Sequence, residues 1–154
     1  MTYNELVAQI RKKKSFLCVG LDTDTDKMPT HLQAKQTGPW EFNKAIIDAT
    51  APYAVAFKPN LAFYEAMGMA GHELLARTAG YIKTHYPETL LIADAKRGDI
   101  GNTAEAYARA LFHYFPFDAV TLSPYMGSDT VTPFLKHPGK WAIVLALTSN
   151  PSSA

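Results

Sequence analysis

Four ionisable residues stand close together near the middle of the chain, directly after an apolar run. Asp94, Lys96, Arg97 and Asp99 fall within six positions and follow "LLIA" at 90–93. Ionised side chains at the end of a buried strand cost free energy to desolvate unless they pair with opposite charges. Side chains two apart on a strand share a face. Asp94 and Lys96 are therefore predicted to point together, with Asp99 folding back or reaching a neighbouring subunit.

Lys58 ends the preceding apolar run, so we expect it beside this pair. The result is an alternating row of Lys58, Asp94, Lys96 and Asp99, in which each charge has opposite partners. Flanking carboxylates favour the charged ammonium form of Lys96. A charged amine cannot form a Schiff base, but it can donate a proton or stabilise negative charge developing beside it. The alternative is an ion-pair ladder with a purely structural role.

Short apolar runs alternate with helical patterns along the chain and supply the elements that position these charges. The predicted strands are 16–21, 53–58, 90–94, 118–122 and 141–147, and the predicted helices are an N-terminal one, 41–50, 69–85, 103–115 and 127–136. Near-continuous apolar strands are typical of a parallel sheet. In the helix over 103–115, Asn102 with Glu105 predicts a capping box. Arg97 should point away from Lys96, toward the helices.

Two architectures fit five βα units: a doubly wound open sheet and part of a (β/α)8 TIM barrel. Polar residues follow every predicted strand, which favours the active face of a barrel over a single switch point. No Gly-rich dinucleotide or P-loop sequence is present. A complete barrel takes about 250 residues. We therefore expect residues 1–154 to be a single incomplete barrel domain with about the first five βα units; completion by another chain is the alternative.

Composition sets the broad class. The 154 residues include 47% hydrophobic and 19% charged residues, typical of a globular protein. Fifteen Lys+Arg against fourteen Asp+Glu give a net charge of +1, which provides no electrostatic case for nucleic acid or membrane partners. The N-terminus lacks a secretory apolar segment, and a cytoplasmic location is expected. Cys18, the only cysteine, is predicted to be a buried small hydrophobe.

The segment "DAKRGDIGNT" (94–103) matches a D-x-K-x-x-D signature and resembles the orotidine 5'-monophosphate decarboxylase family. Further segments agree with the bacterial branch that has longer insertions: "CVGLD", "AFKPNLAFYEAMG", "TLSPYMG" and "LTSNP". The signature alone is shared with sugar-phosphate lyases of the same barrel superfamily, whereas the ordered set of strand-end segments is more specific. The resemblance runs from about residue 16 to the end of the chain. It implies decarboxylation of orotidine 5'-monophosphate to uridine 5'-monophosphate, the last step of de novo pyrimidine synthesis.

The resemblance also implies roles for individual residues. Lys96 matches the proton donor to C6 of the pyrimidine, which also stabilises the C6 carbanion. Asp94 matches the carboxylate beside the departing carboxylate, Lys58 the lysine that contacts the ribose, and Asp99 the residue that crosses a homodimer interface into the partner's active site. Substrate-binding roles fall to three further residues: Asp22 on a ribose hydroxyl, Thr103 near the interface, and Ser149 on the pyrimidine edge.

The family implies no metal and no organic cofactor, and the five histidines show no metal-ligand spacing. Its phosphate-binding residues follow the seventh and eighth strands, a region beyond this sequence. We therefore expect the 154-residue chain alone to be inactive or badly impaired. Two alternatives stay open at this stage. One is a magnesium-dependent sugar-phosphate lyase or aldolase on the same barrel, and the other is a catalytically inactive fragment.

Overall fold

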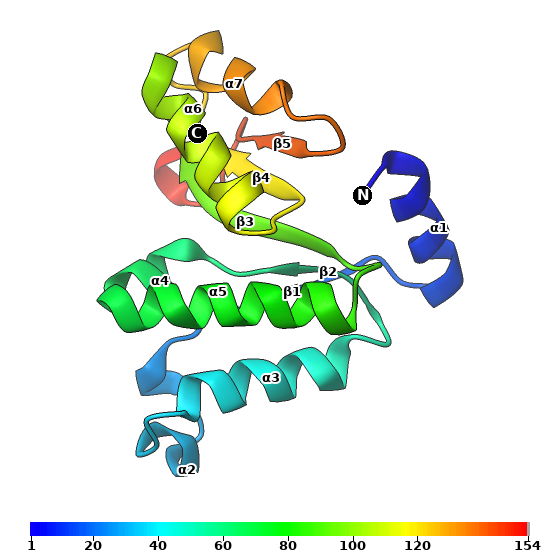
Figure 1. Ribbon diagram of the computed structural model, residues 1–154, viewed down its shortest axis with the longest axis vertical. Helices are drawn as coiled ribbons and strands as arrows, with labels where there is room; N and C mark the ends of the chain where they lie inside the picture. The colour runs from blue at the N-terminus through cyan, green and yellow to red at the C-terminus, as the bar shows by residue number, and fades with distance from the viewer. Residues whose placement is uncertain (154) are drawn as a thin grey trace.

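The computed structural model describes residues 1–153 and contains one parallel sheet with helices packed against it (Figure 1). The strands are β1 (Leu17–Gly20), β2 (Ala54–Lys58), β3 (Leu90–Arg97), β4 (Ala119–Leu122) and β5 (Trp141–Val144). The helices are α1 (Tyr3–Lys13), α2 (Thr30–Gln33), α3 (Gly38–Thr50), α4 (Leu61–Ala66), α5 (Gly68–His85), α6 (Gly101–Arg109) and α7 (Thr132–Leu135). None of the helices within residues 1–153 is long and apolar enough to cross a membrane.

Each strand pairs in parallel with the strand before it, so the sheet order is β1-β2-β3-β4-β5. A doubly wound sheet would reverse direction at a switch point, whereas this unbroken order is that of successive units in a (β/α)8 barrel. The predicted α/β class and all five predicted strands are confirmed. Within residues 1–153, β1 and β5 each pair on one side only.

Helices α3, α5, α6 and α7 cover one face of the sheet, with α3 against α5 on one half and α6 against α7 on the other (Figure 1). The larger core lies between helices and sheet and includes Ile47, Phe57, Leu91, Val120, Leu122 and Phe134. A smaller cluster on the opposite, inner face consists of Ala56, Leu90, Ile92 and Ala119, with Met1, Leu6 and Trp141 packed against it. Since α1 contributes to this cluster, it closes the end of the sheet where the strands begin.

The predicted capping box at Asn102 and Glu105 is wrong. Helix α6 begins earlier, because Gly101 adopts a positive φ of 55° and turns the chain into the helix, so both residues lie inside it. Glu105 instead pairs with Lys136, 3.0 Å away. The helix also ends as a π-helical turn over Ala110–Tyr114 rather than continuing regularly to 115.

The prediction that Cys18 is buried is also wrong: the structure exposes it. Its neighbour Val19 packs against the helix-side core, so Cys18 points to the inner face. Within residues 1–153, that face carries only the small cluster near the strand starts, and β1 is an edge strand of the sheet. An apolar run predicted the strand correctly but did not indicate what covers each face.

Thr89, just before β3, is fully buried, and its hydroxyl has no hydrogen-bond partner within residues 1–153. A buried hydroxyl without a partner retains its desolvation cost. Thr89→Val keeps the branched shape and removes the hydroxyl, so we expect the free energy of unfolding to rise by about 1 kcal/mol in urea titrations. Thr78→Val is the matched control and should destabilise, because the Thr78 hydroxyl accepts a hydrogen bond from Asn43 Nδ2 at 3.1 Å. Loss of stability in the Thr89 variant would contradict this account.

Candidate active site

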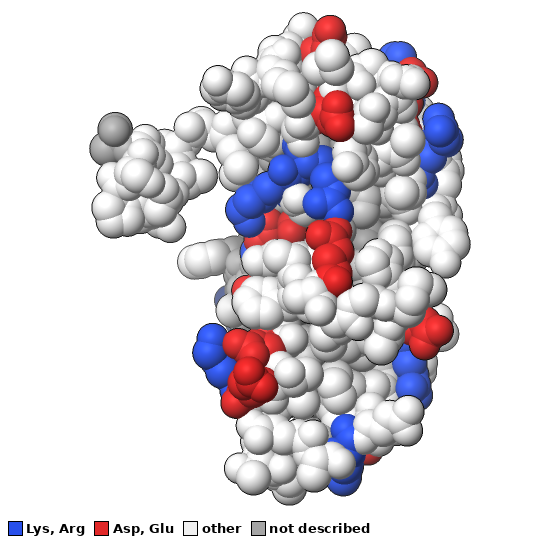
Figure 2. Space-filling model, turned by 90° about the vertical axis from the view of Figure 1, so that its left-hand side faces the viewer, with Lys and Arg blue, Asp and Glu red and all other residues white. Residues whose placement is uncertain are grey.

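Polar side chains replace apolar ones on the inner face at the ends of three neighbouring strands. Each stands two residues beyond a member of the small inner cluster: Lys58 after Ala56, Asp94 after Ile92, and Thr121 after Ala119. Because alternate strand residues share a face, these polar groups form a layer above that cluster. Figure 2 shows acidic and basic side chains gathered near the middle of the face on which the strands end.

Asp94 is the centre of this layer and binds a lysine on each carboxylate oxygen. Lys58 Nζ lies 2.7 Å from Oδ2, and Lys96 Nζ lies 2.5 Å from Oδ1. Asp94 is buried, with 8% of its surface exposed, whereas the Lys96 side chain is 49% exposed. The predicted juxtaposition of Asp94 and Lys96, with Lys58 as lateral neighbour, is confirmed. The buried Asp94 carboxylate thus holds the Lys96 ammonium, while the Lys96 side chain remains half exposed at the ends of the strands.

The two lysines keep Asp94 ionised. Burial alone would raise the pKa of Asp94, but the hydrogen bonds from Lys58 and Lys96 and the positive charge of Lys58 outweigh it, so the pKa lies below the ordinary 3.8. Burial would likewise lower the pKa of Lys58, but its bond to Asp94 and the carboxylate charge raise it above the ordinary 10.5. The pair therefore stays fully charged across the neutral range.

These shifts predict how the pair stabilises the protein at different pH values. The lowered pKa of Asp94 stabilises the folded protein above pH 3.8, and this stability is lost as the pH falls through the folded pKa. The raised pKa of Lys58 stabilises the folded protein below pH 10.5, and this stability is lost as the pH rises through the folded pKa. We expect Asp94→Asn to lower the free energy of unfolding by about 2 kcal/mol. The loss is limited because both lysines are partly exposed and solvent screens their charges. That difference should stay constant from about pH 5 to pH 9 and shrink in acid. An unchanged difference at pH 2 would contradict this explanation.

The backbone at Lys96 is unusual, and Thr121 holds it. Lys96 has a positive φ of 46°, a conformation that non-glycine residues rarely adopt. The Thr121 hydroxyl accepts hydrogen bonds from the Ala95 and Lys96 N–H groups at 3.0 and 2.9 Å, and donates to Asp94 Oδ1 at 3.0 Å. We did not predict Thr121 from the sequence. The available signal was a hydroxyl within the apolar run "AVTL", on the same face as Ala119.

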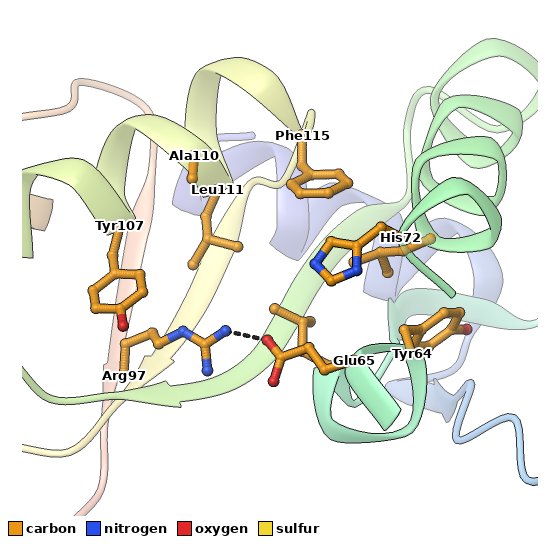
Figure 3. A pocket seen from close by; sticks show the side chains of 10 residues that line it. Tyr64, Glu65, His72, Arg97, Tyr107, Ala110, Leu111 and Phe115 are labelled. Atoms are coloured by element: carbon orange, nitrogen blue, oxygen red, sulfur yellow. Dashed lines mark hydrogen bonds and ion pairs between the residues drawn. The ribbon is translucent and has the colours of Figure 1, made fainter. Parts of the chain in front are cut away.

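Arg97 lies on the opposite face, as predicted. Its guanidinium forms an ion pair with Glu65 of α4, donates to the Ala95 carbonyl at 3.2 Å and lies 5.1 Å from the centre of the Tyr107 ring of α6. Arg97 and Glu65 line a pocket of about 150 Å³ between the helices. Figure 3 shows the two side chains pointing toward one another there. Arg97 therefore links the end of β3 to helices α4 and α6 and points away from Lys58, Asp94 and Lys96.

Asp22 stands exposed after β1, between two residues that a buried polar network fixes. Tyr64 OH donates to the Leu21 carbonyl at 2.9 Å, and Thr23 Oγ1 donates to Asn43 Oδ1 at 2.6 Å. Burial raises the pKa of Tyr64 to about 12, so the phenol remains a neutral donor. The negative charge of Asp22 also contributes to the raised pKa of Lys58. Asp22 thus belongs to the electrostatic surroundings of the row.

Within residues 1–153, the remaining predicted site residues form no hydrogen bond or salt bridge with Lys58, Asp94 or Lys96. Asp99 is half-buried in the loop after β3, where its Oδ1 accepts a hydrogen bond from the Ile100 N–H at 2.8 Å, so the expected fourth member does not join within one chain. Thr103 is exposed on the first turn of α6. Ser149 is exposed in the segment after β5, and the described part of the chain gives it no hydrogen bond to Lys58, Asp94 or Lys96.

Comparisons with known proteins show which family the chain resembles. The model of the "Orotidine 5'-phosphate decarboxylase / HUMPS family" matches residues 15–154. Among curated proteins, orotidine 5'-phosphate decarboxylases from Phocaeicola vulgatus and Bacteroides fragilis are 59% and 57% identical over 153 residues. That match covers 99% of this chain and 56% of each relative. The chain therefore spans about half the length of the curated relatives it matches.

Solved structures show the same relation in three dimensions. A Toxoplasma gondii protein described as an orotidine-monophosphate decarboxylase is 40% identical with a TM-score of 0.90, covering 98% of this chain and 51% of that one. The Leishmania donovani OMP decarboxylase is 39% identical with a TM-score of 0.83, covering 99% and 56%. Fold and sequence agree, and the chain belongs to the orotidine 5'-phosphate decarboxylase / HUMPS family.

Proposed function

We propose that this chain carries the reacting charges of an orotidine 5'-monophosphate decarboxylase, with Lys96 at the reacting carbon. The observation that supports this most is Lys96, whose ammonium lies 2.5 Å from the buried Asp94 and whose side chain is 49% exposed. In the reaction the bond from C6 to the carboxylate breaks, CO2 leaves, and the electron pair remains on C6. The ammonium stabilises that pair and then donates its proton to C6, giving uridine 5'-monophosphate.

The other predicted residues have supporting roles in this proposal. Asp94 stands beside the departing carboxylate and orients Lys96, and Lys58 contacts the ribose while it neutralises Asp94. Asp22 binds a ribose hydroxyl next to Lys58, which fits its electrostatic effect on that lysine. Ser149 contacts the pyrimidine edge. The reaction draws on side chains alone, so a chelator should leave the rate unchanged.

We also propose that the active unit is a homodimer in which Asp99, with Thr103 nearby, completes the partner's site. Asp99 lies in the loop directly after the strand that carries Asp94 and Lys96. Within residues 1–153 its carboxylate forms no salt bridge and accepts the Ile100 N–H through one oxygen. One carboxylate oxygen is therefore available to a ribose bound against another subunit.

The test is a continuous ultraviolet assay of orotidine 5'-monophosphate, run on this chain and on a fusion. The fusion joins the chain to the part of the Phocaeicola vulgatus relative that the match leaves uncovered, since the chain corresponds to 56% of that protein. We expect turnover by the fusion, unaffected by a chelator. Cleavage of a sugar phosphate that stops on chelation, with orotidine 5'-monophosphate untouched, would instead support the lyase alternative.

A further inference from the structure

Thr121 makes three hydrogen bonds through one oxygen, and all three converge on the residues around Lys96. Its Oγ1 accepts from two successive N–H groups, those of Ala95 and Lys96, and donates its proton to Asp94 Oδ1. A hydroxyl has one donor and two acceptor positions, so every position is used. Thr121 is 7% exposed, and water therefore has little access to replace these bonds.

The Lys96 backbone requires such support. A non-glycine residue at positive φ is strained and persists only when its surroundings hold it there. The parallel pairing of β3 with β4 is interrupted between Ala93 and Arg97, so regular ladder bonds do not fix Lys96. In this gap the Thr121 hydroxyl takes the place of a backbone acceptor. On the far side of the gap, the Ser123 N–H donates to the Arg97 carbonyl at 2.7 Å.

The same hydroxyl also orients the carboxylate that holds the ammonium. Asp94 Oδ1 accepts from both Lys96 Nζ, at 2.5 Å, and Thr121 Oγ1, at 3.0 Å. Thr121 therefore contacts Lys96 in two ways. It binds the backbone of Lys96 directly and its ammonium indirectly, through Asp94. Arg97 contributes from the helix side by its hydrogen bond to the Ala95 carbonyl.

We propose that Thr121 is a positioning residue for the decarboxylation, an inference that rests on the proposed function of Lys96. It touches no reacting atom. Its hydroxyl holds Lys96 in the positive-φ conformation and holds the Asp94 carboxylate at the orientation that aims the ammonium. A displacement of about 1 Å in a reacting group can lower a rate by roughly 10²-fold.

The kinetic test compares three variants of the fusion: Thr121→Val, Thr121→Ser and the control Thr89→Val. Valine keeps the branched shape that suits a strand but has no hydroxyl, and serine keeps the hydroxyl. Thr89→Val makes the same change just before β3, at the opposite end of that strand from Asp94 and Lys96. We expect Thr121→Val to lower kcat by roughly 10²-fold with KM nearly unchanged, Thr121→Ser to restore most of the rate, and the control to match wild type.

Amide hydrogen exchange on this 154-residue chain gives a readout independent of activity. In Thr121→Val, the Ala95 and Lys96 amides should exchange at least about tenfold faster, with neighbouring core amides unchanged. Unchanged exchange at both amides would overturn the proposal, and so would a wild-type kcat in an active Thr121→Val fusion. If the wild-type fusion shows no turnover, the proposed function fails. The exchange result then decides alone whether Thr121 holds Lys96.

Discussion

In the fusion, replacing Lys96 with alanine should lower the decarboxylation rate by roughly 10⁴-fold or more, because one ammonium performs two tasks. General acid catalysis contributes about 10²–10⁴-fold, and a fixed charge at a developing anion about 10²–10³-fold. Both are lost together. The fold should remain, because the Lys96 side chain is 49% exposed and alanine occupies the same backbone conformation at a similar cost.

The chain offers a closely matched control for this variant. Lys14 is exposed at the end of α1 and has a positive φ of 49°, close to the 46° of Lys96. Lys14→Ala therefore removes the same charge from the same kind of backbone, far from the charge row. It should retain the wild-type rate. Turnover near the wild-type rate in Lys96→Ala, with the thermal midpoint preserved, would remove Lys96 from the mechanism.

The Asp99→Ala fusion should also lose most of its activity as a homodimer. Mixing the Asp99→Ala and Lys96→Ala fusions should restore part of the activity. In a dimer of one variant with the other, one site combines both defects and the second has an intact Lys96 and an intact Asp99. Random re-pairing of equal amounts makes half of the dimers hybrids. Each hybrid has one whole site of two, so about a quarter of the wild-type rate should return.

This experiment separates a shared site from a site built within one chain. Subunit exchange is first established with two differently tagged wild-type samples, so that a failure to re-pair cannot imitate a negative result. If exchange occurs and no activity returns, Asp99 does not act across an interface. The hydrogen bond from the Ile100 N–H would then describe the whole role of its carboxylate.

The sheet and the core of the site could be predicted because they follow from periodicity. Five apolar runs gave the five strands, and the two-residue spacing placed Asp94 and Lys96 on one face. Lys58 followed as the end of the adjacent strand. Arg97, at the odd position, points to the helices by the same rule. These features depend only on local geometry and on which strands are neighbours.

What could not be predicted depends on contacts between distant parts of the chain. Lys96 has a positive φ where the β3–β4 pairing is interrupted, and there its N–H donates to the hydroxyl of Thr121 on another strand. The exposure of Cys18 depends on what covers the inner face, which an apolar run does not specify. The start of α6 was set by the glycine turn at Gly101 rather than by the side-chain pattern of Asn102 and Glu105.

The most direct measurement is the initial rate at which orotidine 5'-monophosphate loses its characteristic ultraviolet absorbance, in the fusion with and without Lys96→Ala. We expect steady conversion to uridine 5'-monophosphate by the unaltered fusion and a rate lower by roughly 10⁴-fold in the variant. A fusion that is folded and dimeric yet leaves the nucleotide unchanged would contradict this expectation, as would equal rates in the two proteins.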